Sequence, residues 1–251
     1  MIEIISYKFA FIVVLAFVAG FLKTTFGIGA GVFLTPIASL VVHPKVAVGI
    51  LAPLMLASDI TTLRYHWKKW DSKQLFVIVP FGLVGILIGS MYLSWAPTHV
   101  AQITIGTIAI IFSFFQIYRI YFLDLKRHKP YNKGYGIFVS LIAGIASAIA
   151  HSGGIVLTFY LITLQLSKYA FISTLTGYLF FNDILKIALF YKFGILTNHL
   201  ILISSFVIPA LFVGSYVGNK TVNALSYSQF VVIINVLIFT SGILLIIRSF
   251  S

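Results

Sequence analysis

The chain has 251 residues, of which 60% are hydrophobic and only 9% are charged. Soluble domains carry about 25% charged residues, so this composition excludes a soluble globular protein and indicates a protein that resides in a lipid bilayer. The formal net charge is +12, from 17 Lys and Arg against 5 Asp and Glu. Because the basic residues lie mainly in short segments between apolar runs, we attribute this excess to membrane orientation and contact with membrane lipids, not to nucleic-acid binding.

The apolar runs define the expected helices in chain order. They lie at about 7–22, 29–42, 45–63, 74–94, 98–122, 135–150, 154–166, 168–191, 199–218 and 228–249. The six longer runs can each cross a bilayer, which takes about 20 residues. The other four form two pairs, 7–22 with 29–42 and 135–150 with 154–166. As one helix, either pair would measure about 50 Å, too long for a membrane core of about 30 Å. We therefore expect each pair to fold as a hairpin or re-entrant element.

Glycines interrupt both pairs at matching places. The first break lies within Ala19 to Pro36 and contains Gly27, Gly29 and Gly31, and the second lies within Ala143 to Gly154. A shift of 124 residues superimposes Ala19 on Ala143. Broken helices at corresponding places in two halves are the best sequence indication of a transporter's binding site, because irregular backbone at membrane depth must line a cavity or be buried in protein.

The repeat continues beyond the glycine breaks. The same shift aligns Asp59 with Asp183. A shift of 129 places Gly85 and Gly89 on Gly214 and Gly218, and we interpret these G-x-x-x-G pairs as helix-packing positions. We therefore divide the membrane domain into a first repeat, residues 1–125, and a second repeat, residues 126–251.

Basic residues predict how the chain is oriented. Nine of the 17 flank or occupy two connections: Arg64, Lys68, Lys69, Lys73, Arg119, Lys126, Arg127, Lys129 and Lys133. Both connections should therefore be cytoplasmic. Residues 1–8 are too polar and short for a removable targeting peptide, so we expect the first helix to be retained. If each glycine break is a hairpin, each half has an odd number of elements, which makes the repeats inverted with both termini outside. If each broken pair crosses once, the halves run parallel. The segment lengths favour the inverted arrangement.

The expected fold is thus an all-α polytopic membrane protein of two inverted repeats. Each repeat would contain a glycine-broken helical hairpin plus three transmembrane helices. We place the protein in the cell membrane, plasma or inner, as a multi-pass protein. A homodimer is one possible assembly, and the sequence leaves the oligomeric state open.

Two of the five acidic residues lie inside apolar runs at equivalent places in the repeats. An ionisable residue within a span is by default a candidate functional residue. Asp59 and Asp183 could carry a coupled proton or act as gates, with Asn182 as a weaker polar candidate. In the structural alternative, Asp59 pairs with Arg64 or caps backbone near a helix end, and Asp183 pairs with Lys186 one turn further on.

The glycine breaks themselves predict an anion site. Backbone N–H groups at the start of the following helix, together with the helix dipole, bind anions. The residues expected to contact substrate are Lys23, Thr24, Thr25, Gly27, Gly29, Gly31, His151, Ser152, Gly153 and Gly154, with Ser147 nearby. In the alternative, the glycines allow tight packing, the hydroxyls bond helix carbonyls, and His151 is a satisfied interfacial histidine.

Enzyme motifs are missing from the sequence. It contains no H-E-x-x-H, G-x-S-x-G or P-loop pattern and no His cluster with metal-ligand spacing. There is also no Cys for thiol chemistry or metal ligation. We therefore expect no catalysis, no cofactor and no metal.

Three segments carry a family resemblance: GIGAG at 27–31 with Pro36, HSGG at 151–154, and NDILKIALFYKFGIL at 182–196. They resemble the TauE/SafE family of sulfite exporters and toluene-sulfonate-uptake permeases over almost the whole chain. The resemblance implies a permease for small anions such as sulfite, sulfonates or sulfoacetate, with both glycine segments lining the path. The second half departs from the usual glycine triplet and proline, since His151 and Ser152 precede the glycines and Tyr160 stands in the place of Pro36.

Together these features predict a proton-coupled secondary carrier that works by alternating access. Its partners would be a small anionic substrate, protons and membrane lipids. The first alternative is a passive anion channel on the same scaffold, which would have no need of titratable groups such as Asp59 and Asp183. The second is a scaffold or lipid-binding membrane protein. The sequence leaves the exact anion, the direction and the coupling ion open.

Overall fold

The computed structural model describes residues 2–26, 30–122, 132–221 and 227–250. Within these ranges every regular element is an α-helix and there is no strand. The helices are α1 (Ile2–Phe26), α2 (Ala30–Val41), α3 (Pro44–His66), α4 (Ser72–Trp95), α5 (Thr98–Phe122), α6 (Lys133–Ala150), α7 (Gly153–Thr163), α8 (Lys168–Lys192), α9 (Asn198–Thr221) and α10 (Tyr227–Ser249). The predicted all-helical fold is confirmed.

Six of the helices are long and apolar enough to cross a membrane. Their candidate spans are Tyr7–Thr24, Pro44–Arg64, Ser72–Trp95, Thr98–Ile117, Lys133–Ala150 and Asn198–Thr221. Side chains on their outer faces are large and apolar, for example Phe76, which is 87% exposed, and Phe206, which is 69% exposed. In water such exposure would be costly, whereas lipid accommodates it. The protein is a multi-pass integral membrane protein.

The second glycine break is a sharp reversal made by a histidine. His151 ends α6 in the left-handed conformation, with φ 50° and ψ 28°. The backbone N–H of Ser152 then donates to the carbonyl of Ala146, as does the Ser152 hydroxyl at 3.0 Å. A Cβ at Gly153 would lie 2.5 Å from the carbonyl oxygen of Ala143, so glycine is needed here for α7 to start this close to α6.

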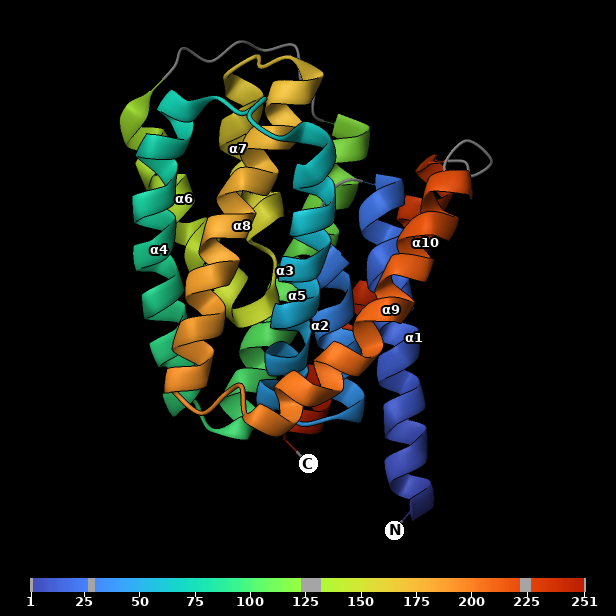
Figure 1. Ribbon diagram of the computed structural model, residues 1–251. Coiled ribbons are helices and arrows are strands. Elements are labelled where there is room, and N and C mark those ends of the chain that lie inside the picture. The colour runs from blue at the N-terminus through green and yellow to red at the C-terminus, as the bar shows by residue number, and fades with distance from the viewer. Residues whose placement is uncertain (1, 27–29, 123–131, 222–226, 251) are drawn as a thin grey trace.

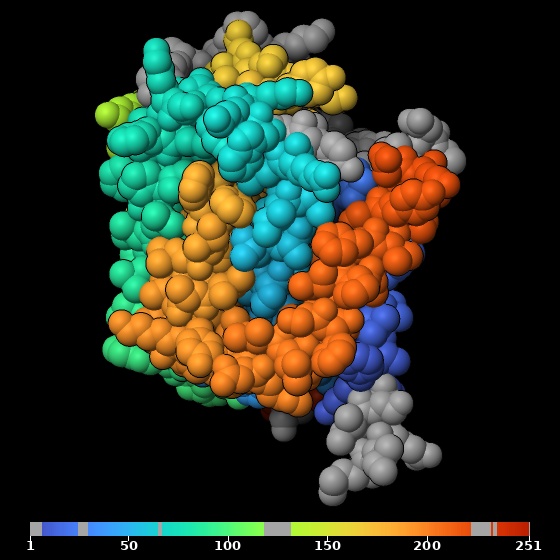
Figure 2. Space-filling model, viewed as in Figure 1, coloured from blue at the N-terminus to red at the C-terminus, as the bar shows by residue number. Residues whose placement is uncertain are grey.

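The helices of the two halves are interleaved. Helix α4 packs against α6, α1 against α9 and α5 against α10, while α3 and α8 contact each other at the centre. Figure 1 shows that α3 and α8 run in opposite directions and that both termini lie on the same side of the molecule. Figure 2 shows α3 reaching the surface between α8 and α9. The centre of the bundle is thus formed by the two helices that carry Asp59 and Asp183.

Glycines permit the closest of these helix contacts. A Cβ on Gly85 of α4 would lie 2.2 Å from the carbonyl oxygen of Leu141 on α6, and one on Gly214 of α9 would lie 1.9 Å from that of Phe17 on α1. A Cβ on Gly89 would lie 2.8 Å from the Cβ of Ala148. Small residues let helix backbones approach closely where lipid supplies no hydrophobic driving force. The packing role predicted for Gly85, Gly89 and Gly214 is therefore confirmed.

Candidate functional site

Two buried ion pairs lie at the centre of the bundle. Nζ of Lys23, in the last turn of α1, donates to Oδ1 of Asp59 on α3. On α8, Nζ of Lys186 lies 2.6 Å from Oδ1 of Asp183, and all four side chains are at most 8% exposed. The predicted pairing of Asp183 with Lys186 is confirmed. The predicted alternative for Asp59 is wrong, because Arg64 is exposed and Asp59 pairs with Lys23 from another helix.

Both pairs line one small cavity. Its lining residues are Lys23, Ala30, Gly31, Met55, Asp59, Ser147, His151, Gly154, Thr176, Leu179, Asp183 and Lys186. The cavity has a volume of about 30 Å³, which is room for a water molecule but too little for a sulfur oxyanion. The structure therefore shows this central pocket closed.

Lys186 is held by three acceptors. Besides Asp183, its Nζ lies 3.1 Å from Oγ of Ser147 and 3.0 Å from Nδ1 of His151. A lysine ammonium has three N–H donors and no acceptor, so these three contacts use all of them. Lys186 is fixed as a cation within the bundle.

The contacts of His151 determine its tautomer. Its Nε2 lies 3.0 Å from the backbone carbonyl oxygen of Val48, which can only accept, so Nε2 carries the proton. Nδ1 therefore accepts from the ammonium of Lys186, and the ring is neutral. The side chain is 7% exposed and both nitrogens are engaged. His151 thus connects α8 to α3 across the turn between α6 and α7.

Within the described part of the chain, the Lys23–Asp59 pair has fewer hydrogen-bond partners than the Lys186–Asp183 pair. Among the described residues, Oδ2 of Asp59 is buried and has no hydrogen-bond partner, while Oδ1 of Asp59 accepts the hydrogen bond that Lys23 donates. An unpartnered carboxylate oxygen at this depth is costly. The Lys23–Asp59 pair is therefore the one that a ligand or a proton can rearrange most readily.

Two helix N-termini reach the same pocket. Ala30 and Gly31 are the first residues of α2, and Gly154 lies in the first turn of α7. The first N–H groups of any helix have no intrahelical acceptor and carry the positive end of its dipole. Lys23 and these two helix starts together give the pocket the donors that an anion requires.

The structure places three of the predicted substrate residues, and the predicted coupling residue Asn182, outside this pocket. Thr24 is exposed and its hydroxyl donates to the carbonyl of Gly20 at 2.9 Å. Ser152 and Gly153 are buried against α6, and Asn182 donates to the carbonyl of Tyr178 at 2.7 Å. These four residues are not among those that line the central pocket. The side chain of Thr25 and the residues Gly27 and Gly29 lie outside the described part of the chain.

Sequence reasoning did not assign Lys186, Met55 or Thr176 to the pocket. Lys186 was considered only as a structural partner of Asp183, although the i, i+3 spacing inside an apolar run already marked both. Met55 and Thr176 are single residues without a pattern, and no sequence signal distinguishes them. In the described part of the chain, no group of three or more His, Asp or Glu side chains could hold a metal.

Comparison with known proteins agrees with this geometry. The sequence model of one family, described as Sulfite exporter TauE/SafE, matches residues 12–245. No curated protein and no solved structure matched the chain. The matched segment includes both ion pairs, both helix breaks and all the residues that line the central pocket. The chain therefore belongs to the sulfite exporter TauE/SafE family.

Proposed function

We propose that this protein is a secondary carrier in the cell membrane that moves a small sulfur-containing anion, such as sulfite, a sulfonate or sulfoacetate, together with a proton. The family implies an anion permease. The observation that carries the finer proposal is the Lys23–Asp59 pair, buried at two helix N-termini with one carboxylate oxygen unpartnered among the described residues. This pair supplies a cation for the substrate and a carboxylate for the proton.

Charge balance explains why the anion and the proton would be transported together. The closed pocket contains two ammonium groups and two carboxylates, which sum to zero. A monovalent anion that binds Lys23 displaces Asp59, and a buried carboxylate without its partner is strongly unfavourable. A proton on Asp59 restores neutrality. Binding the anion and the proton together therefore costs less than binding either alone.

The Lys186–Asp183 pair has a different role from the Lys23–Asp59 pair in the proposed transport. Because Lys186 is held by Asp183, Ser147 and His151, an anion would have to break one of three bonds to reach it. We assign this pair to the fixed wall of the site and Lys23 to the moving side. Lys23 suits that role because it lies in the last turn of α1, next to the helix break.

Alternating access would come from the two halves moving against each other. On the side of the predicted cytoplasmic connections, Tyr160 and Tyr178 are both fully buried in an apolar cluster formed by α4, α6, α7 and α8. The hydroxyl of Tyr160 donates to Oε1 of Gln74 at 2.7 Å and that of Tyr178 to the carbonyl of Ser140 at 2.7 Å. This cluster would be the seal that opens when the inverted repeats rock.

The test is uptake into proteoliposomes of labelled sulfite, sulfoacetate and taurine, with and without a pH gradient. We expect wild-type flux to follow the gradient for at least one sulfur anion, and Asp59→Asn to lose the gradient dependence. Arg64→Gln, at an exposed basic residue on the same helix, is the matched control and should behave as wild type.

The outcomes separate the alternatives. Flux that ignores both the gradient and the Asp59→Asn substitution would indicate a passive anion channel. If no sulfur anion moved through folded protein, the substrate class would be wrong. Loss of gradient dependence in Asp183→Asn but not in Asp59→Asn would move the coupling proton to α8 and contradict the assignment made here.

A further inference from the structure

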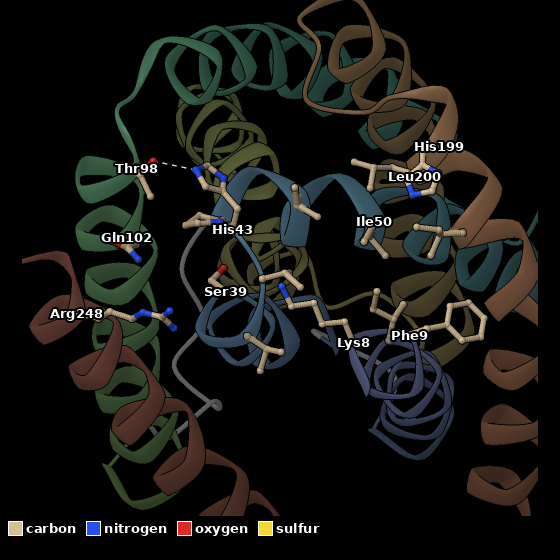
Figure 3. A pocket seen from close by; sticks show the side chains of 16 residues that line it. Lys8, Phe9, Ser39, His43, Ile50, Thr98, Gln102, His199, Leu200 and Arg248 are labelled. Carbon is tan, nitrogen blue, oxygen red and sulfur yellow. Dashed lines mark hydrogen bonds between the residues drawn. The ribbon is translucent and has the colours of Figure 1, made fainter. Parts of the chain in front are cut away.

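A second and larger cavity opens on the side of the molecule where both termini lie. Its volume is about 840 Å³. It is enclosed by the first part of α1, the junction of α2 and α3, the starts of α5 and α9, and the last turn of α10. Figure 3 shows this cavity from close by. None of its lining residues lines the central pocket, so the two are separate sites.

The polar groups around this cavity are basic or neutral. Lys8, His43, His199 and Arg248 line it, together with Ser39 and Gln102, and none of its lining residues is an Asp or a Glu. In Figure 3, Lys8 from α1 and Arg248 from α10 extend toward the same space. One N–H of the Arg248 guanidinium donates to the carbonyl of Leu40, which leaves four of its five donors. The electrostatic preference of the cavity is for an anion.

The position of these cations adds weight to that preference. The predicted orientation makes this the outer face, where membrane proteins carry few basic residues in their short segments. The Lys and Arg residues at the helix ends on this side, within the described part of the chain, are Lys8, Lys45, Lys192 and Arg248. Two of these four line one cavity. These two cations are placed where a ligand could contact them.

The walls of the cavity are apolar. Its lining residues include Phe9, Ile12, Ile50, Leu200 and Ile203, and Figure 3 shows Phe9, Ile50 and Leu200 around the cavity. Small-molecule sites typically have volumes of about 300–1,000 Å³, apolar walls and a few polar groups that fix orientation. A cavity of this kind accommodates an anion that carries an apolar body better than it accommodates a bare inorganic oxyanion.

One face of α2 carries hydroxyl side chains between this cavity and the central pocket. Ser39 lines the cavity and Gly31 lines the pocket, with Thr35 between them at the same four-residue spacing. Residues four apart share a helix face, and eight residues correspond to about 12 Å along the axis. Thr35 and Ser39 are at most 2% exposed, and each donates its hydroxyl to the carbonyl four residues earlier. On α7, by contrast, the same spacing from Gly154 gives Thr158 and then Ile162, which is apolar. Helix α7 therefore has no second hydroxyl at the position that corresponds to Ser39.

We propose that this cavity is a second anion-binding site, a vestibule that holds a soluble organic sulfonate before it reaches the central pocket. Lys8 and Arg248 bind the sulfonate group, and the apolar wall takes the organic body. That the anion then moves on to the pocket rests on the proposed transport function, whereas binding in the vestibule does not.

The test is equilibrium binding of benzenesulfonate to the full chain in nanodiscs of zwitterionic lipid, measured by calorimetry. We expect Lys8→Gln and Arg248→Gln each to weaken binding about tenfold, as for loss of a charge-assisted hydrogen bond. Lys192→Gln removes a cation from the same side outside the cavity and is the matched control, with affinity unchanged. Because Arg248 is exposed, we expect its substitution to leave folding intact.

Three further comparisons test the link to transport, the occupant of the cavity and the site itself. Lys23→Gln should abolish uptake and keep vestibule binding, which distinguishes failure of the transport proposal from failure of this one. Replacing part of the lipid with phosphatidylglycerol should leave benzenesulfonate affinity unchanged; a loss that depends on Arg248 would assign the cavity to an anionic lipid headgroup and overturn the soluble occupant. Equal affinity in wild type, Lys8→Gln and Arg248→Gln would overturn the site itself.

Discussion

Nδ1 of His151 lies 3.0 Å from Nζ of Lys186. An ammonium can only donate, so this contact requires an unprotonated Nδ1 and leaves the ring proton on Nε2, which faces the carbonyl of Val48. The histidine therefore orients a buried cation and does not itself carry charge. It does so from a left-handed backbone position that residues other than glycine adopt only rarely.

This tautomer can be observed directly. We expect ¹⁵N spectra of histidine-labelled protein in lipid to show His151 as a neutral ring with the proton on Nε2 near neutral pH, assigned by loss of the signal in His151→Asn. Asn suits the left-handed backbone conformation, so this variant should fold. An imidazolium signal, with both nitrogens protonated, would contradict the contact with Lys186.

Breaking the Lys23–Asp59 pair should cost stability. Asp59→Leu leaves the ammonium of Lys23 buried without its carboxylate, and removal of one partner from a buried pair costs about 3–5 kcal/mol. We expect a clear fall in the melting temperature of purified protein, measured by intrinsic fluorescence. The double variant Lys23→Met with Asp59→Leu should recover most of that loss, because no buried charge is left over, yet it should not transport. If the single and double variants melt alike, the two side chains are not coupled.

Two glycines at the central pocket should respond differently to alanine. A Cβ on Gly31 would lie 2.3 Å from the Cβ of His151, whereas one on Gly154 would lie 3.2 Å from Cδ1 of Leu179, the end of a flexible side chain. We expect Gly31→Ala to displace the start of α2 from the turn at His151 and to abolish uptake, with a lower melting temperature. Gly154→Ala serves as the matched control and should fold like wild type. Equal tolerance at both positions would contradict the close contact of α2 with His151.

Binding in the vestibule should strengthen in acid. Burial, together with the nearby charge of Lys45, lowers the pKa of His43 from its ordinary value of 6.5, so the ring is neutral at physiological pH. As the pH falls below this lowered pKa, the ring gains a proton and adds a positive charge to the cavity. Benzenesulfonate affinity should rise between about pH 8 and about pH 5, by up to about fivefold, the range of a partly exposed charge pair.

The variant His43→Gln isolates this effect. Glutamine keeps a donor for Thr98, whose Oγ1 lies 2.8 Å from Nε2 of His43, but it cannot gain a proton. We expect the rise in affinity attributable to His43 to disappear while the affinity at high pH is unchanged. A pH dependence that is the same in His43→Gln and wild type would exclude His43 from the vestibule's electrostatics.

Much of the fold could be predicted from local features of the sequence. Long apolar runs identify spans because the bilayer sets their length, and the glycine breaks mark the places where α1 ends before α2 and α6 ends before α7. Asp59 and Asp183 could be identified for the same reason, since a charge in an apolar run is expensive wherever it lies. The ion-pair partner of Asp183 could also be predicted, because Lys186 lies one turn further along α8.

What the sequence alone determined is the membrane location, the helical breaks and the two buried carboxylates. Each follows from the cost of placing polar groups in lipid, which depends on the residues of one segment. Only the tertiary structure decided that Asp59 pairs with Lys23 rather than Arg64, that Thr24 bonds to its own helix and Ser152 to α6, and that the vestibule is lined by cations from α1 and α10. The residues brought together in this way lie from 4 to 240 positions apart. Which helix faces meet depends on where glycines let the helices pack closely.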